Sequence, residues 1–199
     1  NGNYALIVKG DLTITGNGTI VAPGAYGIGV SATGKLTING GNFFGDKIND
    51  YLIGNWGEVV INDGFFWGIY NVLNTFAEGN GTSVITGGQF MTDETDCTGE
   101  YESVAILGIN TTVTGGQFTQ LESEYVAPNY AYITTGEVVK LADVIADDIV
   151  TLEADVVMTE ALKVTGTTIL DLNGKTLTLA NTADAYALIV SGDLKIVGN

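Results

Sequence analysis

A short phrase recurs along the first 119 residues and limits the folds open to this chain. In each copy an apolar residue is followed within a few positions by glycine, asparagine or aspartate, as in LTITGNGTI, LTINGGNFF and SVITGGQFM. That apolar residue serves as the anchor of its copy, and the five anchors are Ile14, Ile38, Ile61, Ile85 and Val113. Successive anchors are 24, 23, 24 and 28 residues apart. Periods of this length are typical of solenoids, in which each repeat packs only on its neighbours.

Each period predicts about three short strands joined by turns. Before the turn, Leu36 and Ile38 alternate with polar residues, which indicates a strand with one face inward. Glycine and asparagine then tolerate the backbone of a corner. After the corner an apolar residue resumes the inner wall, and these residues are Ile20, Phe43, Phe65, Phe90 and Phe118. A second apolar strand is predicted before each anchor, within residues 5–8, 27–30, 51–54, 71–74 and 104–107.

These features predict an all-β protein, a right-handed parallel β-helix with about 24 residues per coil. The sequence lacks the apolar stripe of a helical repeat, the LxxLxLxxN signature of leucine-rich repeats and the six-residue rhythm of left-handed β-solenoids. Asparagines at equivalent turns are expected to stack into side-chain ladders. The candidates for such ladders are Asn17, Asn39, Asn62 and Asn173.

The repeat is interrupted once. Residues 119–138 contain a proline, several acidic residues and three tyrosines, and no anchor. We interpret residues 1–118 as the later coils of one β-helix unit, residues 119–138 as its exit linker, and residues 139–199 as the cap helix and opening coils of the next unit. In the last segment, Leu141, Val144 and Ile145 have the spacing of a short amphipathic helix, which would cover the open end of a solenoid.

The two ends of the chain carry nearly the same sequence. Residues 3–17 and 185–199 are identical at 11 of 15 positions without a gap, at an offset of 182 residues. The anchor strand keeps its apolar residues, since Leu12 and Ile14 reappear as Leu194 and Ile196. This recurrence predicts that the chain is a segment of a longer series, with a repeating unit of about 182 residues.

Several longer phrases resemble a known kind of protein. LADVIADDIVTLEADVVMTEALKVTGTTILDLNGKTLT, LTINGGNFFG and GGQFTQLESEYVAPNYAY are similar to the β-helical repeat units of large bacterial surface proteins and of some phage fibre or head-decoration proteins. The closing phrase is YVAPNY here, where that family has a glycine-containing form. The resemblance implies a β-helical fold and a surface setting, and it implies no particular chemistry.

The charge of the chain restricts its partners. It has 23 acidic residues against 7 lysines, with no arginine and no histidine, and a net charge of -16. Such a charge repels phosphate backbones and anionic lipid, so we expect no nucleic-acid binding. The sequence has no apolar run long enough for a transmembrane helix, and we expect no membrane insertion. Without histidine, serine hydrolase triads and the usual zinc sites are excluded.

The acidic residues offer few candidate sites. Asp147 and Asp148 are an adjacent acidic pair, and we interpret them as a solvated helix end rather than a glycosidase pair. Asp171 is interpreted as part of a structural turn. The acidic loop at residues 93–102 is an alternative site for Ca²⁺, although its spacing is unlike an EF-hand loop. The single cysteine, Cys97, has no partner for an intrachain disulfide. We therefore expect no catalytic residues, no metal and no cofactor.

Aromatic residues are the remaining candidates for a binding site. Trp56, Phe66, Trp67 and Tyr70 lie in two adjacent coils, and exposed rings of this kind stack on sugars or contact proteins. Local packing beneath a loop is the alternative interpretation. We expect a non-catalytic structural or adhesive module of an extracellular fibre or filament, on a cell or virion surface. Its partners would be tandem units or copies of itself, and a surface glycan or protein. The alternatives are a phage fibre or head-decoration protein, and a carbohydrate-binding or polysaccharide-degrading β-helix.

Overall fold

The computed structural model describes residues 4–22, 26–45, 51–93, 104–144, 149–179 and 186–198. The chain divides into two compact units, Asn1–Glu122 and Ser123–Asn199, and each is described by itself. The expectations for Cys97, for Asp147 and Asp148 and for nearly all of the acidic loop fall outside the described residues.

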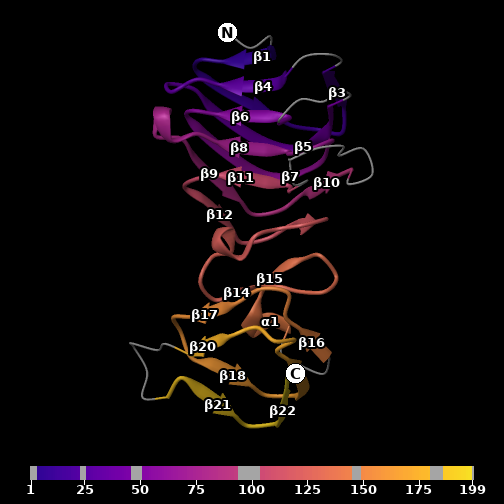
Figure 1. Cartoon of the computed structure of the whole chain (residues 1–199), viewed down its shortest axis with the longest axis vertical. Helices are drawn as coiled ribbons and strands as arrows, with labels where there is room; N and C mark the ends of the chain where they lie inside the picture. Colours follow the sequence, from indigo (N-terminus) through magenta and orange to yellow (C-terminus); the bar gives the residue numbers. More distant parts are fainter. Residues whose placement is uncertain are drawn as a thin grey trace. The chain divides into compact units, whose positions relative to one another are not determined.

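One wall of the first unit is a five-stranded parallel sheet, which we call the first sheet (Figure 1). Its strands are β1 (Tyr4–Val8), β4 (Tyr26–Val30), β6 (Ile53–Asn55), β8 (Leu73–Thr75) and β11 (Ile106–Gly108). Each comes from a successive coil, and inward apolar residues form a column. The column consists of Leu6, Ile28, Ile53, Leu73 and Ile106. The predicted second apolar strand of each period is therefore confirmed.

The other walls belong to one eight-stranded parallel sheet that bends at the glycine-rich corners, the second sheet. Its strands are β2 (Asp11–Ile14), β3 (Thr19–Ala22), β5 (Lys35–Gly45), β7 (Glu58–Gly68), β9 (Thr82–Ile85), β10 (Gln89–Thr92), β12 (Thr111–Val113) and β13 (Gln117–Phe118). The five anchors pair in sequence order from coil to coil, and from Ile38 onward they are fully buried. The predicted fold class, an all-β parallel β-helix with about 24 residues per coil, is confirmed.

The inner wall after the corner contains Phe66, and the prediction of Phe65 at this position is wrong. Phe66 pairs with Phe43 and Phe90, is fully buried, and stacks on both rings at centroid distances of 4.9 and 4.8 Å. Phe65 instead aligns with the outward residues Asn42 and Gln89. The reason is the corner itself, where the pairing register shifts between Ile38 and Asn42 and resets which side chains point inward.

The predicted turn ladder is present in part. The Asn62 side-chain amide donates to Asn39 Oδ1 at 2.7 Å, and the Thr86 hydroxyl donates to Asn62 Oδ1 at 2.9 Å. Asn173 lies in the second unit, where its amide donates to the Leu152 carbonyl oxygen at 3.2 Å. The amide ladder thus spans the turns of neighbouring coils in the first unit.

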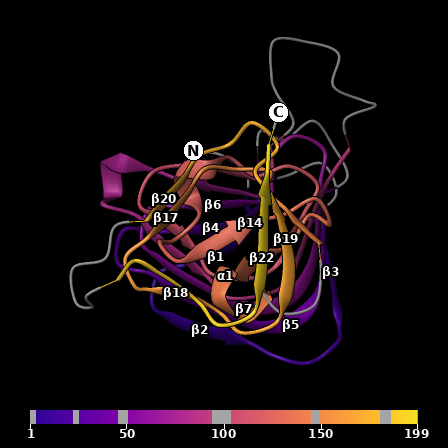
Figure 2. The same ribbon diagram turned by 90° about the horizontal axis from the view of Figure 1, so that it is seen from below.

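The second unit begins with an antiparallel hairpin and continues as parallel coils. The hairpin strands are β14 (Tyr130–Tyr132) and β15 (Val138–Lys140). Three small parallel sheets follow. The first consists of β16 (Ile149–Thr151), β19 (Thr167–Asp171) and β22 (Asp193–Val197). The second pairs β17 (Val156–Met158) with β20 (Leu177–Leu179), and the third pairs β18 (Leu162–Val164) with β21 (Leu188–Val190). Seen from below in Figure 2, these three sheets bound three sides of the unit.

A short helix lies between the hairpin and the coils. Helix α1 (Leu141–Val144) starts at the leucine that the sequence pattern indicated, and the residues after Val144 are outside the described part. In Figure 2 the helix lies within the outline of the three sheets. Leu141 is fully buried in a core with Val150, Leu162 and Leu170, so the first residue of the helix closes the apolar interior of this unit.

The repeated sequence forms the same two strands in both units. In the first unit β2 pairs with β5, which follows it along the chain, and Ile14 lies opposite Ile38. In the second unit β22 pairs with β19, which precedes it, and Ile196 lies opposite Leu170. The coil with this sequence therefore pairs with a later coil in the first unit and with an earlier coil in the second unit, so the two parallel neighbours lie on opposite sides of it.

Candidate functional site

The four aromatic residues predicted as a platform lie in different environments. Phe66 belongs to the buried phenylalanine ladder, and Tyr70 is also buried, with 7% of its surface exposed. Neither ring is exposed as a binding platform requires, and in the case of Phe66 the corner turns the side chain inward. Trp67 is partly exposed and points outward beside Phe44 and Met91 on the second sheet. Trp56 follows β6 and is partly exposed on the first sheet.

Trp56 belongs to a cluster of five rings that covers the outer face of the first sheet. The members of this aromatic cluster are Tyr4, Tyr26, Tyr51, Trp56 and Phe76. The Trp56 indole stacks on the Phe76 ring with a centroid distance of 4.3 Å and an interplanar angle of 6°, and Tyr4 meets the indole edge-on at 6.1 Å. A hydrogen bond of 2.9 Å joins the hydroxyls of Tyr4 and Tyr51. The rings support one another across four successive coils.

Two glycines make room for this cluster. Gly29 and Gly54 are paired neighbours in β4 and β6, at a position whose side chains would point outward. A Cβ at Gly29 would lie 3.0 Å from the Tyr4 ring, and one at Gly54 would lie 2.5 Å from Tyr51 and 3.0 Å from Trp56. Real Cβ atoms do not approach so closely, so the glycines let the rings lie flat against the backbone of the sheet.

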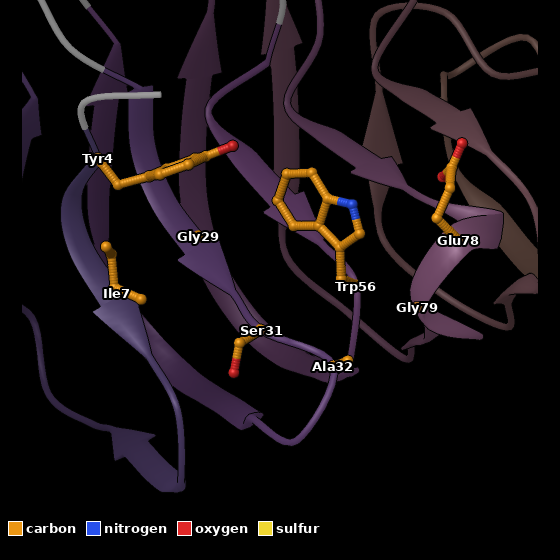
Figure 3. Close-up of a pocket in the computed structure, with 8 residues that line it drawn as sticks. All are labelled: Tyr4, Ile7, Gly29, Ser31, Ala32, Trp56, Glu78 and Gly79. Carbon is orange, nitrogen blue, oxygen red and sulfur yellow. The ribbon is translucent and has the colours of Figure 1, made fainter. Parts of the chain in front are cut away.

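A cavity of about 470 Å³ opens beside Trp56 (Figure 3). Figure 3 shows the indole nearly face-on, Tyr4 edge-on across the opening, and Glu78 on the neighbouring 3₁₀ turn, Ala77–Gly79. The remaining lining residues are Ile7, Gly29, Ser31, Ala32 and Gly79. The lining is mostly apolar, with Glu78 as its only charged residue. Cavities of this size and character are typical of small-ligand sites.

The surroundings of Tyr4 in the aromatic cluster change the pKa of its phenol. Burial raises its pKa above the ordinary value of 10.0, the hydrogen bond with Tyr51 acts in the opposite direction, and Tyr26 adds to the increase. The ring therefore stays neutral through the physiological range. A neutral phenol serves this cavity as an apolar wall with one hydroxyl already engaged.

A second concave surface lies at the glycine corners of the second sheet. Its cavity measures about 400 Å³ and is lined chiefly by amides and glycines, with Asn17, Asn39, Asn42, Asp63, Phe65 and Gln89 as its larger side chains. Three of its polar side chains are already engaged, because Asn39 accepts from Asn62, Asp63 accepts from the Gly64 N–H, and the Asn42 amide donates to the Asn17 carbonyl. This surface is the outer side of the turn ladder.

Two absences concern only the described part of the chain. There, no group of three or more histidine, cysteine or acidic side chains is arranged to hold a metal ion. In the same residues no helix is long and apolar enough to cross a membrane.

The sequence contains a signal for this site, which becomes visible only when the coils are compared with one another. Tyr4, Tyr26 and Tyr51 each lie two residues before an inward residue of the first sheet, so equivalent positions of three coils carry tyrosine. Ser31 and Trp56 likewise follow the paired residues Val30 and Asn55. Aligning the coils on this strand, rather than on the anchors alone, would have brought the ring cluster together.

No protein-family model, curated protein or solved structure matches the chain. The class of protein is therefore defined by its architecture, and the chain is a parallel β-solenoid.

Proposed function

We propose that this chain is a non-catalytic structural link of an extracellular fibre, on a bacterial cell or a virion, in which β-helical units follow one another coil on coil. The observation that carries the proposal is the repeated coil, which we define as residues 4–16 in its first copy and residues 186–198 in its second. The fibre requires that one coil pair with a neighbour on each side.

The two copies together display both of those pairings. β2 of the first copy is paired along the side that faces later coils, and β22 of the second copy is paired along the side that faces earlier ones. Among the described strands, each copy has one unpaired side, and the other copy shows that the same sequence is paired there. Unpaired strand edges favour the addition of a further parallel strand.

The apolar residues of the second copy support the same conclusion. Val190 and Ile196 are 44% and 49% exposed, although their partners Val164 and Leu170 are fully buried. In the first unit the residues opposite Val8 and Ile14 are Val30 and Ile38, both fully buried. A following coil would therefore bury apolar surface that now contacts water, which is favourable by about 25 cal/mol per Å².

A chain extended at its C-terminal end tests the proposal. A second copy of residues 18–68 is joined after Asn199, because Asn199 is equivalent to Asn17. We expect the added residues to fold as two further coils and to slow amide exchange in residues 193–197 by at least about tenfold. The control carries the same added residues in scrambled order. Unchanged exchange in residues 193–197 together with rapid proteolysis of the added coils would refute the proposal.

A pair of substitutions tests whether separate chains also join through the unpaired edge of the second copy. Ile196→Asp places a charge on the uncovered apolar end, whereas Ile189→Asp places it on an outward position of β21, opposite Lys163. If chains assemble end to end, sedimentation velocity will show mass increasing with concentration, and only Ile196→Asp will abolish the increase. A constant monomer mass would restrict the proposal to units joined in one polypeptide.

A further inference from the structure

The aromatic cluster contains a gap of one ring. Ser31, Trp56 and Phe76 occupy equivalent positions of three successive coils, because the Trp56 N–H donates to the Val30 carbonyl and the Phe76 N–H donates to the Asn55 carbonyl, both at 2.8 Å. Trp56 and Phe76 stack as consecutive rungs. At the level of Ser31 the side chain is a single hydroxymethyl group, so a ring is missing where the ladder would continue.

The position of the gap suits a flat ligand. Coils of a parallel sheet repeat every 4.8 Å or so, which is close to the separation of stacked rings. One face of the indole is covered by Phe76, and the indole also lines the cavity together with Tyr4, Ile7 and Ala32. Gly29 also lines the cavity, and its lack of a side chain lets the Tyr4 ring lie close to the sheet there. A ring that entered this gap would stack on Trp56 and touch apolar groups along its edges.

Two polar groups at the gap determine what kind of ring fits. The Ser31 hydroxyl is buried and has no hydrogen-bond partner within the described part of the chain. An unsatisfied buried hydroxyl is costly, and a ligand hydroxyl would satisfy it once the Ser31 side chain turned its hydroxyl into the cavity. The Glu78 carboxylate lies on the rim and accepts hydrogen bonds strongly because it is charged. A hydroxyl-bearing ring matches both groups, whereas a quaternary ammonium cannot hydrogen-bond to Ser31.

The charge of the protein further restricts which classes of ligand can bind. The chain carries a net charge of -16, and none of its lysines lines the cavity. A uronic acid or a sulfated sugar would be repelled by Glu78 and by the whole protein. We propose that this gap, the Trp56 slot, binds one pyranose of a neutral glycan, with the apolar face of the sugar on the indole and its hydroxyls on Ser31 and Glu78.

Tryptophan fluorescence provides a direct test. In a Trp67→Phe background Trp56 is the only tryptophan. The protein is titrated separately with cellohexaose, mannohexaose, xylohexaose and chitohexaose, and with oligogalacturonate and choline as charged comparisons. We expect a saturable change in Trp56 emission with at least one neutral oligosaccharide and none with oligogalacturonate. The absence of saturable binding by every neutral probe, or tighter binding of choline, would overturn the proposal.

Variants then locate the bound sugar by calorimetry. We expect Trp56→Ala to weaken binding at least about tenfold, the order of a lost aromatic stack. Trp67→Ala, the matched change on the second sheet, should leave affinity unaltered. Ser31→Phe should fill the slot and block binding while thermal stability is kept, and Glu78→Gln should weaken binding about threefold or more. Equal losses from Trp56→Ala and Trp67→Ala, or full affinity in Ser31→Phe, would place the sugar elsewhere and refute the assignment.

Discussion

Adjacent phenylalanines of β7 provide the sharpest test of the coil register. Phe66 is fully buried and stacks on a ring in each neighbouring coil, with interplanar angles of 8° and 12°. Truncating a buried phenylalanine to alanine costs about 3–5 kcal/mol. Because two stacked pairs are lost at once, we expect Phe66→Ala to lower the free energy of unfolding by about 4–5 kcal/mol.

The same change one residue earlier should be mild. Phe65 is partly exposed, and its ring makes a tilted contact with Phe44 at a centroid distance of 5.7 Å. We expect Phe65→Ala to cost about 1 kcal/mol, the loss of one aromatic pair at the surface. Phe66→Leu, which retains most of the buried volume, should fall between the two at roughly 1–2 kcal/mol.

Urea denaturation followed by tryptophan fluorescence measures these differences in the relevant unit. Trp56 and Trp67 both belong to the first unit, and they are the only tryptophans of the chain. The midpoint and slope of the transition therefore report on that unit alone, and an unchanged slope shows that the change lies in stability. If Phe65→Ala destabilised the unit as much as Phe66→Ala, the inward register of the second sheet would be wrong by one residue.

Three further predictions concern single coils. Gly57→Ala should cost about 2 kcal/mol, because its Cβ would overlap carbonyl oxygens of the preceding coil, whereas Gly10→Ala, with no atom within 4 Å, should change stability by less than about 0.5 kcal/mol in the same denaturation assay. Asn55→Ala should cost about 2–3 kcal/mol by urea denaturation, because this fully buried side chain makes three hydrogen bonds, and its loss would remove a partner from the Gly57 N–H and the Thr82 carbonyl. The raised pKa of Tyr4 means that its stabilising contribution is complete below pH 10.0 and is lost as pH rises through the folded-state pKa. Between about pH 9 and 11, the midpoint temperature of thermal unfolding should therefore fall less steeply with pH in Tyr4→Phe than in the wild type.

The sequence was sufficient to predict the coils because stacking aligns equivalent residues. Anchors about 24 residues apart can share one interior only if successive coils lie in register, and the pairing of Ile38 with Ile61 and Ile85 follows from that requirement. The short helix at Leu141 was also visible, since its apolar spacing differs from the period of two in the strands.

The orientation of side chains after each corner was not predictable in the same way. Period-two alternation is continuous only within a strand, and Gly64 adopts a φ of 138° that breaks the alternation between Ile61 and the phenylalanines. Where two aromatic residues are adjacent, as Phe65 and Phe66 are, the pattern does not determine which of them points inward. The aromatic cluster escaped prediction for a related reason, because its rings come from four coils and meet only through the glycine positions of the first sheet.

The repeated coil connects the two proposals. Tyr4 and Ile7, which line the Trp56 slot, have identical equivalents in the second copy at Tyr186 and Ile189, and these are 69% and 37% exposed. In a fibre of stacked units the next coils would supply the glycine and the tryptophan beneath Tyr186, and would complete another slot. One weak sugar site would then recur once per unit along the fibre. Regularly spaced weak sites on one scaffold bind a polymeric glycan far more tightly than a single site does. An appended copy of residues 18–92, which includes Trp56, Phe76 and Glu78, should therefore add a second sugar site in the same calorimetric titration, and failure to add it would separate stacking from sugar binding.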